Sequence, residues 1–409
     1  MKCDYDVVVI GAGAAGLVAA AESCQRGRRT LLIEKNRRPG VKILMSGGTR
    51  CNITHATDKW GIVRAYGEQG SFLHSALAAL SPADLVQLIE AEGVPTKVEE
   101  SGKIFPVSNR ATDVLEALLL RLQRSGAELA LAEPVRGLER LAEGFRVQTA
   151  ARELAAHKLV ITVGGQSYPG SGTTGDGYAW AGALGHTVVP PRPALVPLTT
   201  GEAWIRALSG VSVPDASLTL DLQTKPQPAA RGSLLFTHFG LSGPVVLDIS
   251  RYVTALPDPA AAMLLVDFLP GQKLEQLDEA LRSTAASDGK RQVAGILAEH
   301  MPRRLIDALL SRASLPLDLR GAQISKTARA ALVAALKRTA IPITGTRGFA
   351  KAEVTAGGVS LAEIDSRTME SKLVPGLYFA GEILDLDGPI GGYNFQAAFS
   401  TGFLAGKRA

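Results

Sequence analysis

Three glycines near the amino terminus have the spacing of a dinucleotide-binding turn. Gly11, Gly13 and Gly16 come directly after the apolar run at residues 5–10. In such a turn the first glycine permits a tight bend, the second lets the backbone approach a pyrophosphate, and the third lets a helix pack closely on the strand. The N-terminus of that helix then offers free N–H groups and a partial positive charge to phosphates. This segment therefore predicts a nucleotide site, although an incidental glycine-rich turn is the alternative.

A carboxylate stands where such a site needs one. The short apolar run at residues 30–33 ends at Glu34, 18 residues after Gly16. An acidic residue at this spacing accepts hydrogen bonds from ribose hydroxyls, and its charge disfavours a 2′-phosphate. The pattern therefore favours FAD or NAD over NADP, and it does not separate FAD from NAD.

Two further segments have residue types suited to a flavin nucleotide. Residues 34–52 contain glycines and five basic side chains, which can neutralise a pyrophosphate, with a solvated basic loop as the alternative. Near the carboxyl terminus an apolar run ends in Gly381 and Glu382, and Gly391 and Gly392 precede a final helix of small residues. The carboxylate can accept from ribityl hydroxyls and the helix N–H groups can meet a flavin carbonyl, with a surface strand and an acidic turn as the alternative.

The elements that must position these residues alternate between strands and helices. We expect a strand at 5–10, a helix at 17–26, a strand at 30–33, a helix at 112–124 with a β excursion after it, and a strand at 158–163 leading through Gly164 to a helix. The prolines at 190–193 mark a break. After it we expect strands at 218–222, 234–237 and 263–268, and then helices at 274–283, 292–300, 304–311 and 327–339.

Composition fits a soluble multidomain protein. The 409 residues exceed one ordinary core, and 46% are hydrophobic and 20% charged. The net charge of +5 is a mild surplus that an anionic small molecule explains, so we expect a small-molecule substrate and no nucleic acid. Three unpaired cysteines favour a reducing compartment and no zinc site. The apolar run at 7–21 has acidic residues before it and is too short to span a bilayer, so we expect a cytoplasmic protein without a membrane partner.

With these motifs the chain resembles the BaiN-like, or YhiN-like, family of NAD(P)/FAD-dependent oxidoreductases. The segments that carry the resemblance are 42–52, 164–169, 172–178, 235–244, 355–359, 368–372 and 381–394. One departure is Thr49, where the family usually has a third glycine.

The resemblance implies an α/β fold with a Rossmann-like FAD-binding domain of glutathione-reductase type. Residues 1–192 and 341–409 would build this domain, residues 193–271 an inserted β-barrel-like domain, and residues 272–340 a helical insert. The residues expected to bind FAD are Gly11, Gly13, Ala14, Ala15, Gly16, Glu34, Lys35, Lys42, Ser46, Arg50, Cys51, Asn52, Val135, Gly164, Gly381, Glu382, Gly391, Gly392, Asn394 and Phe395.

The function that follows is a FAD-dependent oxidoreductase reduced by NAD(P)H, with hydride passing to an organic acceptor such as an activated carbon–carbon double bond. No second glycine triplet is present, so the nicotinamide would bind transiently. A flavin-dependent amine oxidase and a FAD-containing nucleic-acid binder or modifier, prompted by a pI of 9.1, are the alternatives. No catalytic residue is predicted, because a lone cysteine or histidine, here Cys51 or His238, is more often structural.

Overall fold

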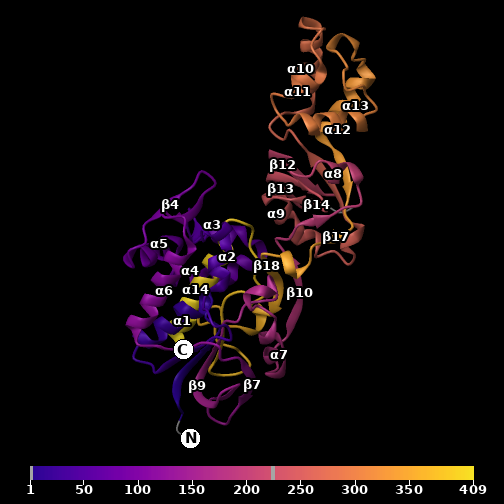
Figure 1. The fold of residues 1–409 in the computed structure, drawn as a ribbon. Helices are drawn as coiled ribbons and strands as arrows, with labels where there is room; N and C mark the ends of the chain where they lie inside the picture. Colours follow the sequence, from indigo (N-terminus) through magenta and orange to yellow (C-terminus); the bar gives the residue numbers. More distant parts are fainter. Residues whose placement is uncertain (1–2, 223–225) are drawn as a thin grey trace. The chain divides into compact units, whose positions relative to one another are not determined.

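The computed structural model describes residues 3–222 and 226–409, which fold into two compact units (Figure 1). Unit 1 consists of Met1–Pro193 and Glu353–Ala409, and unit 2 of Ala194–Ala352. Residues 341–352, which the sequence assigned to the second part of the FAD-binding domain, belong to unit 2. The reason is that β16 (Thr339–Pro342) and β17 (Gly345–Thr346) are strands of its sheet.

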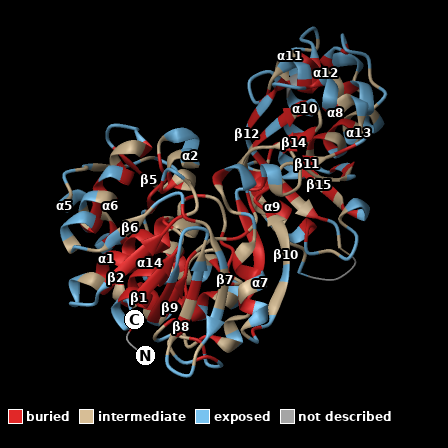
Figure 2. Cartoon of the chain, turned by 60° about the horizontal axis from the view of Figure 1, so that its bottom comes forward, coloured by how far each residue is buried: buried red, intermediate tan, exposed pale blue. Residues whose placement is uncertain are grey.

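Unit 1 is built on a seven-stranded sheet of order β6-β2-β1-β9-β8-β7, with β19 also paired to β9. The strands are β1 (Tyr5–Ile10), β2 (Thr30–Ile33), β6 (Glu128–Ala130), β7 (Val135–Arg140), β8 (Phe145–Thr149), β9 (Glu153–Ile161) and β19 (Leu377–Phe379). The first three run parallel to β9 and β19, whereas β8 pairs antiparallel with both β9 and β7. The α/β Rossmann-like fold is therefore confirmed, and the apolar, β-branched runs are buried as parallel strands require (Figure 2).

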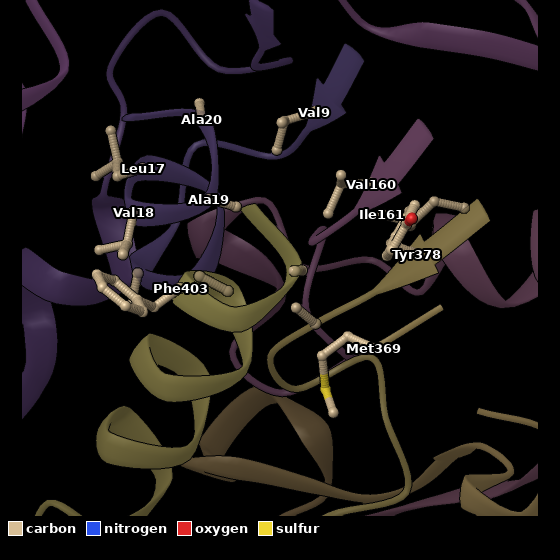
Figure 3. Packing of buried hydrophobic residues seen from close by; sticks show 14 of the residues in the cluster. Val9, Leu17, Val18, Ala19, Ala20, Val160, Ile161, Met369, Tyr378 and Phe403 are labelled. Carbon is tan, nitrogen blue, oxygen red and sulfur yellow. The ribbon is translucent and has the colours of Figure 1, made fainter. Parts of the chain in front are cut away.

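The two ends of the chain meet in one core. Helix α1 (Ala14–Gln25) packs along α14 (Tyr393–Arg408), and Figure 3 shows Phe403 of α14 beside Val18 of α1. A Cβ on Gly402 or on Gly406 would lie 2.3 Å from a backbone oxygen of α1. Because any side chain at these positions would push the helices apart, this glycine pair fixes the close contact.

The remaining elements of unit 1 surround the sheet. They are α2 (Val41–Thr49), β3 (Thr54–His55), α3 (Lys59–Ala65), η1 (Gly67–Leu73), α4 (His74–Ala79), α5 (Pro82–Ala91), β4 (Thr96–Val98), β5 (Lys103–Pro106), α6 (Ala111–Ser125), η2 (Pro169–Ser171), α7 (Asp176–Ala183), β10 (Val188–Ala194), β18 (Val354–Val359) and η6 (Leu361–Glu363). In the described part of the chain, no single helix is long and apolar enough to cross a membrane; one bent pair, Gly67–Ala79 with Pro82–Ala91, reaches that length and apolarity.

Unit 2 has an antiparallel sheet of order β16-β15-β12-β13-β14-β11-β17. Besides β16 and β17, its elements are β11 (Leu198–Thr199), α8 (Ala203–Ala207), β12 (Ser212–Leu220), β13 (Ala229–Thr237), β14 (Gly240–Ser242), α9 (Pro244–Val253), η3 (Pro259–Ala261), β15 (Met263–Asp267), α10 (Leu274–Ser287), α11 (Val293–Leu297), α12 (Arg303–Arg312), η4 (Gly321–Gln323), α13 (Lys326–Lys337) and η5 (Phe349–Lys351). The sheet and the helices share one hydrophobic core, which includes Phe236 of β13 and Leu305 of α12. The expected strands and helices are present with shifted ends, and the barrel-like closure stays a prediction.

Candidate dinucleotide site

The candidate site lies at one edge of the unit 1 sheet. In the sheet Ile10 pairs with Ile33 and with Ile161, and Ile161 also pairs with Phe379. Four parallel strands therefore end at the same level, and the loops that follow them meet there. The carboxyl edge of a parallel sheet is where ligands bind in folds of this type.

The glycine turn has the geometry that its spacing predicts. A Cβ on Gly16 would lie 1.8 Å from the carbonyl oxygen of Gly11, so helix α1 reaches the strand only because residue 16 is glycine. Gly11 has φ +101°, a conformation that side chains disfavour. A Cβ on Gly13, by contrast, would meet nothing within 4 Å. The N-terminus of α1 is therefore open on the side from which a pyrophosphate would approach.

Glu34 is held firmly at the end of β2. Its two carboxylate oxygens accept hydrogen bonds from the backbone N–H groups of Ala12 and Asn36, both at 2.8 Å. Its own carbonyl accepts from Glu133 N–H at 3.0 Å, two residues before β7 begins at Val135. The structure thus brings the glycine turn, Glu34 and the start of β7 together.

A polar network links Glu382, after β19, to three other segments. One carboxylate oxygen accepts from Lys42 Nζ at 2.5 Å. The other accepts from Ser167 Oγ at 2.6 Å and from Thr355 N–H at 3.0 Å. Lys42 also donates to Ser167 Oγ at 2.7 Å, which closes the network. Lys42 and Glu382, both predicted as site residues, are therefore joined by Ser167 and Thr355, which the motifs do not predict as site residues.

The loop after Lys42 departs from the helix that begins there. Ser46 is extended with ψ 151°, and Gly47 and Gly48 have φ +56° and +67°. Thr49 and Cys51 continue in the left-handed region with φ +70° and +62°, which is rare for residues with a Cβ. Threonine therefore stands at a position whose backbone suits glycine.

The N-terminus of α14 joins this loop. The surrounding donors and acceptors determine the orientation of the Asn52 amide. Its oxygen accepts a hydrogen bond from Gly392 N–H at 2.9 Å, and its nitrogen donates to the Thr54 carbonyl at 3.0 Å. A Cβ on Gly392 would lie 2.5 Å from the Thr54 backbone, so only glycine permits this approach. The ring of His55 stacks on that of Tyr393, with 4.7 Å between the ring centroids. Nδ1 of His55 forms a hydrogen bond with the Gly391 carbonyl.

Most of the other predicted site residues form side-chain contacts within the protein. Lys35 Nζ lies 2.5 Å from Asp176, whose burial opposes ionisation but whose pKa is lowered by hydrogen bonds from Lys35 and Thr174. Arg50 forms an ion pair with Glu99 at 2.6 Å. Asn394 binds the backbone of Gly388 through both amide atoms, and Phe395 stacks on Phe399. Ala14 and Ala15 are buried at the start of α1, whereas Ser46, Gly164 and Gly381 are half-buried. Ser46 Oγ donates to the Ile43 carbonyl, and Gly381 N–H donates to Thr401 Oγ1.

A family model described as the HI0933-like protein Rossmann domain matches residues 5–408. The chain belongs to this family. It is 36% identical, over 98% of its length and 97% of the relative's, to the Ribosomal RNA dihydrouridine synthase of Escherichia coli. It is 31% identical to the 3-dehydro-bile acid delta(4,6)-reductase of Clostridium scindens, with 98% of each chain covered. A solved Sdh1 complex from Mycobacterium smegmatis, in the apo form, has a TM-score of 0.50 at 17% identity over 98% of this chain and 67% of that one, a likeness of fold.

Membership of the HI0933-like family confirms the resemblance drawn from the motifs. It makes the chain a Rossmann-type flavoprotein of the oxidoreductase class. The NAD(P)H donor, the acceptor and the individual site residues stay predictions.

Neither Cys51 nor His238 has the surroundings expected of a catalytic side chain. Cys51 is fully buried, and burial raises the pKa of its thiol to about 12, so the nucleophilic thiolate is scarce at neutral pH. His238 is an exposed residue of unit 2 in edge contact with Phe239.

Asp385 and Tyr178 of the HI0933-like chain form a second polar group, which the sequence motifs do not predict. Burial, and then the negative charge of Asp387, raise the pKa of Asp385, while Arg192 opposes the shift. Tyr178 is buried, and among the described residues its hydroxyl has no hydrogen-bond partner. Burial and the charges of Glu382 and Asp385 raise the pKa of that tyrosine, so it stays protonated. Their sequence signal is only that both lie within the family's motif segments.

Proposed function

We propose that the chain is a FAD-dependent reductase of carbon–carbon double bonds conjugated to a carbonyl, with a uracil base of ribosomal RNA as its acceptor and NAD(P)H as its electron donor. The observation that carries this proposal is full-length similarity to two reductases whose names state their products or substrates.

The two named activities share one chemistry. Dihydrouridine is uridine whose ring double bond, conjugated to a carbonyl, has taken up two hydrogens. A delta(4,6)-reductase of a 3-oxo steroid reduces double bonds conjugated to a carbonyl in the same way. In both, a hydride adds to the carbon distal to the carbonyl and a proton adds to the carbon beside it. A single flavin site therefore suits either acceptor, and the difference between them is one of binding.

The residues of unit 1 fit FAD. The open face at Gly13 and the N-terminus of α1 suit the pyrophosphate, and Glu34 suits the adenosine ribose. The carboxylate of Glu382 suits ribityl hydroxyls, and the N-terminus of α14 at Gly392 suits the ring carbonyls. Bound FAD supplies hydride chemistry that no amino-acid side chain offers. The protein's part is to hold the donors and acceptors in place and to exclude solvent.

RNA is preferred to a steroid because two relatives named for ribosomal RNA, from Escherichia coli and Haemophilus influenzae, match at 36% and 34% identity. The proposal therefore adopts the alternative of a nucleic-acid modifier. It replaces the expectation that the protein has no nucleic-acid partner. The reduction of a dienone is the second candidate, favoured by the 31% identity to the bile-acid enzyme.

The test is an anaerobic reaction with the purified holoenzyme. The enzyme is first reduced with NADPH or NADH and then mixed with ribosomal RNA from cells that lack the gene, or with a 3-oxo-4,6-dienoyl steroid. We expect reoxidation of the flavin by the RNA, and nucleosides that contain dihydrouridine after digestion. Reoxidation by the steroid alone would assign the second function. Failure of both nicotinamides to bleach the flavin would remove NAD(P)H as donor.

A further inference from the structure

The positive charge of the chain is concentrated in one segment. Unit 1 contains 26 basic and 26 acidic residues and is neutral, whereas unit 2 contains 18 and 13. Within unit 2, residues 272–340 contain twelve lysines and arginines and seven aspartates and glutamates. This helical segment therefore holds a surplus equal to the whole net charge of +5.

Ion pairs account for only part of these cations. Four arginines of the segment pair with acidic residues within it, and Arg312 and Lys337 pair with Glu202 and Asp267 outside it. Arg304 donates to a backbone carbonyl. In the described residues no carboxylate forms an ion pair with the other five cations, all of them exposed: Lys273, Lys290, Arg320, Lys326 and Arg338.

Two of the five, Lys290 and Arg320, lie on two chain segments that are paired through their backbones. Residues 289–293 and 319–322 run antiparallel, with Gln292 bridged to Arg320. Hydrogen bonds of 2.9 to 3.0 Å hold them together, from Gly321 to Arg291, from Ala322 to Gly289 and from Val293 to Leu319. Lys290 lies two residues before Gln292, the residue opposite Arg320, so backbone hydrogen bonds hold the segments of Lys290 and Arg320 together.

Lys326 extends this group. It begins helix α13 three residues after η4, and η4 packs against α10. Lys326 is close enough to Asp278 of α10 to lower the pKa of that carboxyl, although the hydrogen bond from Arg329 is the larger cause. Lys290, Arg320 and Lys326, which we call the basic face, are thus exposed on adjoining parts of one helical subdomain.

Such a face suits a polyanion better than a small anion. Exposed cations without carboxylate partners are available for phosphate groups, and each contact releases a condensed counterion from the nucleic acid. Small molecules bind in concave pockets with convergent polar groups, whereas these three side chains are exposed. Since unit 1 has equal numbers of basic and acidic residues, its net charge provides no long-range attraction for RNA.

We propose that the basic face formed by Lys290, Arg320 and Lys326 binds the phosphate backbone of the RNA whose uracil is reduced. This inference rests on the proposed function. It assigns to unit 2 the sequence-independent part of RNA binding, and leaves recognition of the base to the flavin site.

The test compares two triple variants of the holoenzyme. In one, Lys290→Gln, Arg320→Gln and Lys326→Gln remove the basic face. In the matched control, Arg28→Gln, Arg64→Gln and Arg140→Gln remove three exposed cations of unit 1 that have no ion pair among the described residues. Binding of a ribosomal RNA fragment is measured by fluorescence anisotropy at several salt concentrations. Bleaching of the flavin by NAD(P)H serves as the readout of an intact flavin site.

We expect the basic-face variant to bind RNA about tenfold more weakly, with a plot of log Kd against log salt that is shallower by about 2 to 3, since each phosphate contact contributes about 0.7 to 0.9 to the slope. Flavin bleaching should equal that of wild type. The charge-conserving set Lys290→Arg, Arg320→Lys and Lys326→Arg should restore most of the slope.

A wild-type protein that reduces uridine in RNA, while both triple variants show the same slope, would overturn this inference and leave the proposed function intact. A wild-type protein that neither binds nor reduces RNA would overturn both. Vesicles containing phosphatidylglycerol provide a further comparison. Loss of vesicle binding in the basic-face variant, with RNA binding unchanged, would assign the face to anionic lipid and overturn the inference.

Discussion

Replacing Thr49 with glycine should stabilise the flavin-binding unit. Thr49 has φ +70°, and a residue with a Cβ pays about 1–2 kcal/mol for this conformation. Glycine avoids that cost but loses about 0.5–1 kcal/mol through its greater freedom in the unfolded chain. The exposed hydrogen bond from Thr49 Oγ1 to the Gly48 carbonyl, at 2.5 Å, is also lost, and it contributes little against water. The net gain is about 0.5–1 kcal/mol.

The assay follows the release of FAD, by its fluorescence, as the protein is heated. For a unit of this size 1 kcal/mol corresponds to about 2–4 °C, so Thr49→Gly should raise the release temperature by about 1–4 °C. The matched control is Thr49→Ala, which keeps a Cβ in the same backbone conformation and should melt below the glycine variant. If the glycine variant melts at or below the alanine variant, the left-handed conformation of residue 49 is not a source of strain and the reasoning fails.

Three further predictions concern unit 1. Gly16→Ala should lower the melting temperature of the apoprotein, by overpacking worth about 1–3 kcal/mol, whereas Gly13→Ala should weaken FAD binding with little change in apoprotein melting; equal effects of both would contradict the assigned roles. Asp385→Asn should stabilise the protein at about pH 7 and lose this advantage near pH 4, because a raised pKa means that the native state binds the proton more tightly than the unfolded state and that ionisation above the ordinary pKa costs stability. Urea unfolding at the two pH values checks this, and an equal advantage at both would refute it. Cys51 should resist alkylation by iodoacetamide in the folded holoenzyme, and mass spectrometry that finds it labelled faster than the partly exposed Cys24 would contradict its burial and its pKa of about 12.

The sequence predicts those parts of the site that depend on local backbone. The strand, glycine turn and helix around Gly11, and the acid at Glu34, follow from spacing because each residue acts through the conformation of its own segment. The sequence also predicts that both chain ends converge, because a nucleotide-type strand end near each terminus suggests one shared sheet. Gly402 and Gly406 are spaced by about one helical turn, and this spacing is a sequence signal for close packing of the last helix.

The rest depends on contacts between distant residues. Ser167 is 215 positions from Glu382 in the chain, and Lys42 is 340 positions from it, so no local pattern reveals that they bind the same carboxylate. In the same way, the guanidinium group of Arg50 could bind a phosphate, but it forms an ion pair with Glu99 of a neighbouring loop. Residue type shows what a side chain can bind, and only the tertiary arrangement decides between partners.

The positions of the Glu34 and Glu382 carboxylates suggest how FAD would be oriented in the proposed site. Glu34 is held by two backbone N–H groups, and Glu382 by Lys42, Ser167 and Thr355, so both are positioned by protein donors alone. Preorganised carboxylates accept from hydroxyl groups but repel phosphates. The pyrophosphate must then lie away from both, at the open N-terminus of α1 near Gly13. With the ribose at the end of β2 and the ribityl chain at the end of β19, we expect the flavin ring toward α14. Glu34→Gln and Glu382→Gln should therefore separate in their effects, the first weakening adenosine binding and the second perturbing the flavin spectrum.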